Sequence, residues 1–219
     1  MRASAPQSYL VYPLTDLLGS GGNVRVLRAL VRHGGPLSVA QLSRETGLSS
    51  PGVRAVLDGL VDRQVVIAIG AGRSLLYELR PHHPLAGALR DLFQHEKRRW
   101  ERVLDALRSA MEAEKDVEAA WYYGSVARGE DGPASDLDVA VVVRTEDVES
   151  VLVRLRNALA SAEEELLVTF AIIGLSHKDV RRLAQTDPWW INVVRDAKVL
   201  IGPRPETLAA RLKKRNAAA

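Results

Sequence analysis

Two apolar runs separated by a short polar segment restrict the fold of this chain more than any other feature. Residues 117–123 and 139–143 have the length and composition of buried strands. The first run ends in a Gly-Ser pair, ten residues follow, and an Asp-Leu-Asp triplet leads into the second run. The pattern predicts a sheet with a turn after one strand and two acidic residues at the start of the next.

The polar residues beside these runs suit a phosphate group and a metal ion. Gly124 lets the backbone approach a phosphate closely, and Ser125 with the amide groups of the following helix start offers hydrogen-bond donors. Side chains at alternate positions of a strand share a face, so we expect Asp136 and Asp138 to point together. Two carboxylates on one face suit Mg²⁺, which prefers oxygen ligands and is often completed by nucleotide phosphates and water.

The Gly-Ser pair, the ten-residue spacing and the Asp-x-Asp triplet resemble the signature of the DNA polymerase beta nucleotidyltransferase superfamily, and most of all its minimal bacterial and archaeal domains. The similarity extends over residues 119–143. It implies that Gly124 and Ser125 bind the triphosphate of a nucleoside triphosphate, and that Asp136 and Asp138 are catalytic residues and Mg²⁺ ligands. Arg128 is then expected to neutralise charge on the pyrophosphate leaving group.

One part of the family pattern is missing. Active members usually add a third carboxylate from a later strand, which we place at residues 166–173. That run contains no acidic residue, and Thr169 stands about where the acid is expected. Because a hydroxyl is a poor substitute for a charged oxygen ligand, we expect weakened catalysis. A different register could bring Glu165 into the site, although a solvated helix end is the simpler interpretation of that residue.

A helical pattern precedes this segment, near the start of the chain. Apolar residues at helical spacing predict a helix at residues 23–32. Ser38 and Gln41 form a capping-box pattern that opens a short second helix at residues 39–46. Gly47 can end this helix because glycine readily adopts the left-handed conformation.

A third helix and a hairpin follow. Ser50 as N-cap, with Pro51 at the first helical position, begins the third helix. Residues 65–69 and 74–79 are β-type runs, and the glycines of residues 70–73 permit a hairpin between them. Two helices joined by a tight turn and followed by a hairpin predict a winged helix-turn-helix.

The order of these elements, together with the string LSSPGVRAVLDGLVDRQVV, resembles the winged helix-turn-helix regulators of the arsenic-repressor and multiple-antibiotic-resistance-repressor type over residues 14–80. The resemblance implies binding to double-stranded DNA and a role in transcription regulation. Ser49, Ser50 and Arg54 are then expected to reach the major groove. Arg73, in the wing, would meet phosphate or the minor groove.

We therefore predict an α+β chain in three parts. A winged helix-turn-helix DNA-binding domain occupies residues 14–82, and a long connecting helix lies within residues 83–115. A small mixed-sheet nucleotidyltransferase-like α/β domain occupies residues 116–212. The connecting helix carries an apolar stripe that could pack against a second copy of the chain, so a homodimer is a further hypothesis.

Composition excludes several classes of protein. The chain has no cysteine, which excludes disulfides, thiolate zinc sites and cysteine nucleophiles. No run approaches about 18 apolar residues, and the first residues lack the apolar stretch of a signal peptide, so we expect no membrane span and a cytoplasmic location. Residues 1–83 carry nine arginines against five acidic residues, an excess that favours a polyanion partner but is equally typical of an ordinary solvated surface.

These features support two main hypotheses. In the first, the protein is a DNA-binding regulator whose nucleotidyltransferase domain binds a Mg–nucleoside triphosphate or has weakened chemistry. The alternative is an active enzyme that transfers a nucleoside monophosphate to a hydroxyl of a protein, as in antitoxin-like relatives, or of a small molecule. In a third hypothesis, the winged helix delivers the catalytic domain to a protein partner.

Overall fold

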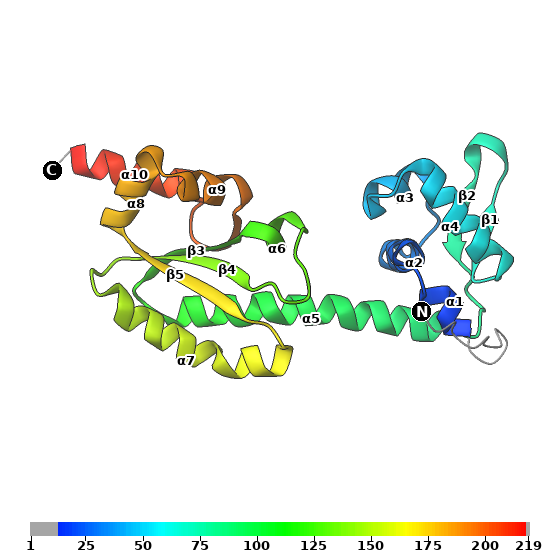
Figure 1. Ribbon diagram of the computed structural model, residues 1–219, viewed down its shortest axis with the longest axis horizontal. Helices are drawn as coiled ribbons and strands as arrows, with labels where there is room; N and C mark the ends of the chain where they lie inside the picture. Colours follow the sequence, from blue (N-terminus) through cyan, green and yellow to red (C-terminus); the bar gives the residue numbers. More distant parts are fainter. Residues whose placement is uncertain (1–12, 218–219) are drawn as a thin grey trace, which may run out of the picture. The chain divides into compact units, whose positions relative to one another are not determined.

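A computed structural model describes residues 13–217 of the chain (Figure 1). The chain divides into two compact units, and the boundary between Arg98 and Arg99 falls inside the long helix α5 (Ala86–Ala113). The division into three parts with a separate connecting segment stays a prediction. Within the described residues, no helix has both the length and the apolar character needed to cross a membrane.

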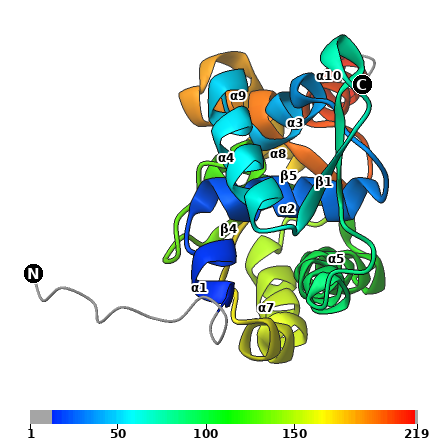
Figure 2. The ribbon, with the colours of Figure 1, turned by 90° about the vertical axis from the view of Figure 1, so that its right-hand side faces the viewer.

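The first unit consists of helices and one hairpin. β1 and β2 pair antiparallel, with Val66 opposite Leu79 and Ile69 opposite Leu76. The hairpin can be followed in Figure 1 and from the side in Figure 2. The elements before α5 are α1 (Pro13–Leu18), α2 (Gly21–His33), α3 (Val39–Thr46), α4 (Ser50–Asp62), β1 (Val66–Ile69), the 3-10 helix η1 (Gly72–Ser74) and β2 (Leu76–Leu79).

The predicted helix-turn-helix is present. The Ser38 hydroxyl accepts a hydrogen bond from the backbone of Gln41, whose side chain accepts one from the backbone of Ser38, so the capping box is confirmed. Gly47 ends α3 in the left-handed conformation with φ of 69°. α3 and α4 pack with α2 around one buried apolar core, which includes Val26, Leu27, Leu30, Leu42, Val53, Leu57 and Leu60.

Three details of this unit differ from the prediction. The N-cap of α4 is Ser49 and not Ser50, because the Ser49 hydroxyl accepts the backbone N–H of Gly52. Helix α1 was not predicted. The segment between the two hairpin strands is longer than predicted, since β2 begins at Leu76 and the connection forms η1.

The second unit contains a four-stranded mixed sheet. The strand order is β5-β4-β3-β6; β3 pairs antiparallel with β4 and with β6, whereas β4 and β5 are parallel and joined by α7. This connection is a β-α-β unit. The elements after α5 are β3 (Val117–Tyr123), α6 (Gly124–Arg128), β4 (Leu137–Val143), α7 (Val148–Leu166), β5 (Phe170–Ser176), α8 (His177–Thr186), α9 (Pro188–Asp196), β6 (Lys198–Ile201) and α10 (Pro205–Ala217).

Helices cover both faces of this sheet. α7 and the second half of α5 pack on one face, and α8, α9 and α10 pack on the other (Figure 1). Trp121 of β3 is completely buried on the second face, where its indole N–H donates to the carbonyl of Pro203 at 2.8 Å. The indole ring of Trp190 packs edge-on against it with centroids 6.1 Å apart. Trp190 is therefore a core residue.

The position of β5 corrects one prediction. Residues 166–173 were predicted as a strand, but α7 continues to Leu166, and Leu167 ends the helix in the left-handed conformation with φ of 51°. The strand begins only at Phe170. A run of apolar residues fits a helix end and a strand equally well, so the sequence pattern did not separate the two.

The long helix predicted within residues 83–115 is present as α5. Leu92, one residue of its apolar stripe, is 49% exposed. Homodimerisation through this stripe stays a prediction.

Candidate functional site

The predicted site lies where β3 ends and β4 begins. Tyr123, the last residue of β3, stands opposite Asp138 of β4 in the antiparallel register. The chain turns at Gly124 into the short helix α6, passes through residues 129–136 and returns in β4. This topology brings the Gly-Ser pair and the Asp-x-Asp triplet together, although ten residues separate them in sequence.

Gly124 fits this position for two reasons. Its φ is +75°, a backbone conformation that residues with a Cβ rarely adopt. A Cβ at this position would lie 2.4 Å from Oδ2 of Asp138, well inside van der Waals contact. The Asp138 carboxylate thus packs directly on the backbone of Gly124, the first residue of α6.

The two carboxylates have different environments. Asp136 precedes β4 and is exposed, whereas Asp138 lies within β4 and is half-buried. Burial is the main cause that raises the pKa of Asp138, and the nearby charge of Asp136 raises it further, while Arg128 acts in the opposite direction. The site therefore holds two close negative charges that a cation would stabilise.

The Arg128 guanidinium has two carboxylate partners. Its Nη1 donates to Oδ2 of Asp196 at 2.5 Å, and its Nε donates to Oε2 of Glu130 at 2.7 Å. Asp196 is the last residue of α9, and its side chain is only 4% exposed. Arg195 contacts the same carboxylate. Sequence reasoning missed Asp196 and Arg195, because only the packing of α9 against α6 brings them to the site.

The β5 positions nearest the carboxylates carry no acid. Asp138 stands opposite Ala171 in the parallel register, and the backbone N–H of Leu137 donates to the carbonyl of Thr169. Glu165 lies in the last turn of α7 and forms an ion pair with Arg102 of α5. Its interpretation as the missing acid is therefore wrong. Among the described residues, no group of three or more His, Cys, Asp or Glu is arranged to hold a metal ion.

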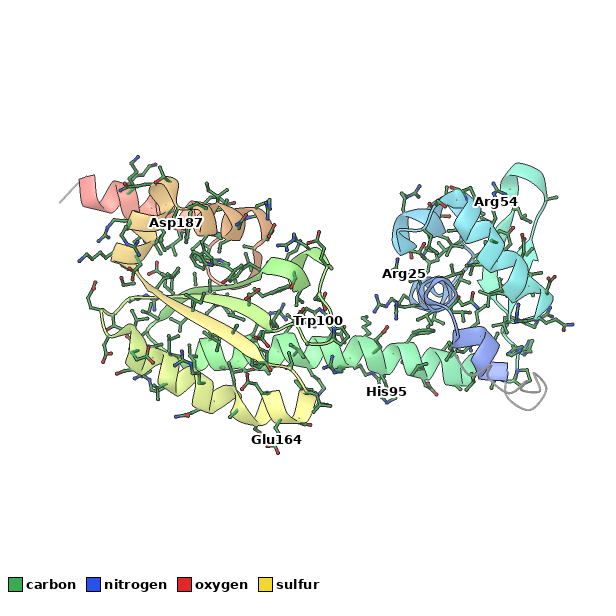
Figure 3. The ribbon with its side chains drawn as sticks, in the orientation of Figure 1. Arg25, Arg54, His95, Trp100, Glu164 and Asp187 are labelled. Carbon is green, nitrogen blue, oxygen red and sulfur yellow. The ribbon has the colours of Figure 1, made fainter. Side chains whose placement is uncertain are left out.

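The predicted DNA-contacting residues lie on α4 and in the wing. Ser50 and Arg54 are exposed on α4, and Figure 3 labels Arg54 on this helix. Ser49 is also exposed, but its hydroxyl caps the helix. The backbone of Arg73 lies in η1, and its side chain falls outside the described part of the structure.

Two solved structures illustrate what this chain is similar to. A chain in the crystal structure of a toxin–antitoxin with AMP-PNP is 18% identical, with a TM-score of 0.35, over 54% of this chain and 86% of that chain. The archaeal chromatin protein TrmBL2, described as showing a novel mode of DNA binding, is 16% identical, with a TM-score of 0.28, over 84% and 76%. No significant match is found among curated proteins.

Family models give the assignment of each unit. One model, the MarR family, matches residues 16–73, which hold the helix-turn-helix and the first strand of the hairpin. A second model, described as polymerase beta, nucleotidyltransferase, matches residues 105–187, which hold Gly124, Ser125 and both carboxylates. The chain therefore combines a winged helix of the MarR family with a nucleotidyltransferase domain of the polymerase beta family.

Proposed function

We propose that this protein is a DNA-binding regulator whose nucleotidyltransferase domain binds a Mg–nucleoside triphosphate. The observation that carries the second half of this proposal is the packing of Asp138 on Gly124, 2.4 Å from where a Cβ would stand. Such close approach leaves the backbone at the start of α6 beside a pair of carboxylates. Asp136 and Asp138 would hold a cation there, and its charge would favour a phosphate chain beside the start of α6.

The donor set fits Mg²⁺ as part of a shared site. Asp136 and Asp138 would supply two hard oxygen ligands, and phosphate oxygens with water would complete the coordination. Burial, and after it repulsion from Asp136, raises the pKa of Asp138, and a divalent cation beside the ionised carboxylate would offset both effects. When bound, Mg²⁺ neutralises charge on the triphosphate.

The protein residues around these carboxylates would bind and orient the nucleotide. Gly124 lets the Asp138 carboxylate lie against the backbone, and Ser125 offers a hydroxyl at the start of α6. Arg128 brings a positive charge close enough to Asp138 to influence its pKa. These three residues favour an anionic ligand at a site that would otherwise be negative.

The residues at the start of β5 and just before it favour binding over efficient transfer. Neither Thr169 nor Ala171 can supply a third carboxylate, so charge developing on the reacting phosphate would be less well neutralised. Transfer of a nucleoside monophosphate to a hydroxyl is the second candidate, and the family match over residues 105–187 favours it. Incubation with labelled ATP, Mg²⁺ and a panel of protein and small-molecule acceptors separates the two, because only transfer produces a labelled acceptor.

Calorimetric titration with ATP tests the nucleotide site. Wild-type protein should bind ATP in the presence of Mg²⁺, and Asp136→Asn and Asp138→Asn should each weaken binding at least tenfold, about 1.4 kcal/mol. Asp131→Asn is the matched control, because Asp131 is an exposed acid in the same loop. Equal ATP affinity of wild type and the three variants, or no binding of ATP by wild type, would contradict the proposal.

The DNA half of the proposal rests on the winged helix and its charge. Exposed Arg54 on α4 and the excess of arginine over acid in residues 1–83 support contact with phosphate and base edges. Arg54→Ala should weaken binding to a fluorescent genomic duplex and reduce the slope of log affinity against log salt by about 1. Arg90→Ala, an exposed arginine of α5, is the charge-matched control. An unchanged affinity of Arg54→Ala would remove this assignment.

A further inference from the structure

A buried carboxylate beside the candidate site holds two arginines. The Asp196 side chain is 4% exposed, and both of its oxygens accept hydrogen bonds. Arg195 donates from Nε to Oδ1 at 2.7 Å and from Nη2 to Oδ2 at 3.1 Å, a two-pronged contact. Arg128 donates to Oδ2 at 2.5 Å. One fixed negative charge thus orients two positive ones.

The cluster holds two arginines and two carboxylates, and of the carboxylates only Asp196 is buried. Arg195 holds Asp196 through two hydrogen bonds, and Arg128 adds a third to Oδ2. The remaining negative partner of Arg128 is Glu130, whose side chain is 64% exposed and free of burial constraints. An exposed partner of this kind can be replaced by a ligand oxygen at little cost.

Both guanidinium groups also remain accessible. The side chains of Arg128 and Arg195 are 36% and 61% exposed, so each can present further N–H donors to a ligand while it holds Asp196. The pKa of Asp196 lies at about 2, chiefly because Arg195 donates hydrogen bonds to it, with Arg128 adding to the effect. The anchor is therefore charged at any pH at which the protein would act.

We propose that Arg128 and Arg195, oriented by Asp196, form a clamp for the polyphosphate chain of the nucleotide. The inference rests on the proposed function, since it assigns the terminal phosphates of that same nucleotide to Arg128 together with Arg195. Asp196 is a positioning residue, and Arg195 is the new contact. Two fixed guanidinium groups suit a chain of several phosphates, so the clamp should favour nucleoside triphosphate over monophosphate.

Titration of three ligands in Mg²⁺ buffer tests the clamp: ATP, AMP and inorganic tripolyphosphate. Arg195→Gln should raise the Kd of ATP and of tripolyphosphate about tenfold, the loss expected for a charge-assisted contact, and change that of AMP less than about twofold. Asp196→Asn should reduce the same preference for ATP over AMP. Glu130→Gln should bind ATP as tightly as wild type or more tightly, because it removes a competing carboxylate.

Arg204→Gln is the matched control. The Arg204 side chain is 61% exposed, as is that of Arg195, and it pairs with Glu206 at 2.9 Å. Its ATP affinity should equal that of wild type. In Arg195→Gln the buried Asp196 keeps its hydrogen bond from Arg128, and the Gln amide can donate another, so this variant should fold even if Asp196→Asn does not. Far-UV circular dichroism checks each variant.

The outcomes separate the clamp from the proposed function. If wild type binds ATP but Arg195→Gln binds ATP and tripolyphosphate equally well, the clamp is wrong and the nucleotide site stands. Binding of tripolyphosphate that depends on Arg195, without binding of ATP, supports the clamp and overturns the nucleotide assignment. If wild type binds neither ligand, both are wrong.

Discussion

At Gly124, the backbone conformation and the neighbouring side chain both disfavour any other residue. Gly124→Ala places a Cβ at positive φ and 2.4 Å from Oδ2 of Asp138. We expect a loss of about 1–2 kcal/mol of unfolding free energy from the backbone strain, and at least tenfold weaker ATP binding because Asp138 must move. Urea denaturation and calorimetry measure the two effects.

Gly132→Ala is the control for this substitution. Gly132 lies in the same loop, and a Cβ there would meet no atom within 4 Å. It should change the unfolding free energy by less than about 0.5 kcal/mol. Similar behaviour of the two variants would show that the contact between Gly124 and Asp138 has no energetic role.

Asp138 is expected to lower stability at neutral pH. Its pKa is raised, mainly by burial and then by Asp136, so its ionised form is less favourable in the folded than in the unfolded state. Asp138→Asn should therefore increase the unfolding free energy at pH 7. The gain should shrink as pH falls through the raised folded pKa and vanish below about 4, the ordinary value, where both states are protonated.

Urea denaturation of wild type and Asp138→Asn between pH 3 and 8 measures this dependence. Asp131→Asn, an exposed acid of the same loop, should show no comparable gain. A loss of stability in Asp138→Asn at pH 7 would mean that the ionised carboxylate is stabilised by the fold, and the electrostatic account of the site would be wrong.

The N-terminus of α4 shows how an element depends on one cap. The structure assigns the cap to Ser49, whose hydroxyl accepts the N–H of Gly52 at 3.2 Å. Ser49→Ala should cost about 1 kcal/mol of unfolding free energy, whereas Ser50→Ala should cost less than about 0.5 kcal/mol. Thermal or urea unfolding followed by circular dichroism compares the variants. A larger loss of stability in Ser50→Ala than in Ser49→Ala would show that Ser50, the residue predicted from sequence, is the N-cap.

Elements with local signals could be predicted from the sequence, and elements defined by packing could not. The helix over residues 39–46 has a capping box at one end and glycine at the other, and its predicted and observed bounds agree. β5 has no such signals, so its predicted start was four residues too early. Helix α10 was not predicted because its sequence is mostly polar and alanine-rich.

The candidate site divides in the same way. Gly124, Ser125, Asp136 and Asp138 occur within one short segment, and their spacing was enough to identify them. Arg195 and Asp196 lie about 60 residues further along the chain, and no spacing rule connects them to Arg128. Only the fold of the second unit, which packs α9 against α6, brings these side chains together.

At the scale of the whole molecule, the two compact units have separate buried cores. The core of the first ends with Phe93 in α5, and the cores of the second begin with Val103 in the same helix. All four tryptophans of the chain belong to the second unit: Trp100, Trp121, Trp189 and Trp190. Tryptophan fluorescence therefore reports on the nucleotidyltransferase domain alone, whereas far-UV circular dichroism reports on the helices of both units.

We expect urea unfolding curves from these two probes not to coincide, because separate cores can lose their structure in separate transitions. Mg-ATP at about 100 times its Kd should stabilise the domain that binds it by about 2.7 kcal/mol. Mg-ATP should therefore move the fluorescence transition to higher urea concentration. The part of the circular dichroism change that comes from the first unit should stay at the same urea concentration. Coincident curves that shift together with ATP would instead show that α5 couples the units into one cooperative structure. Nucleotide binding would then change the stability of the winged helix as well. By linkage, DNA would change the affinity for ATP by the same factor by which ATP changes the affinity for DNA.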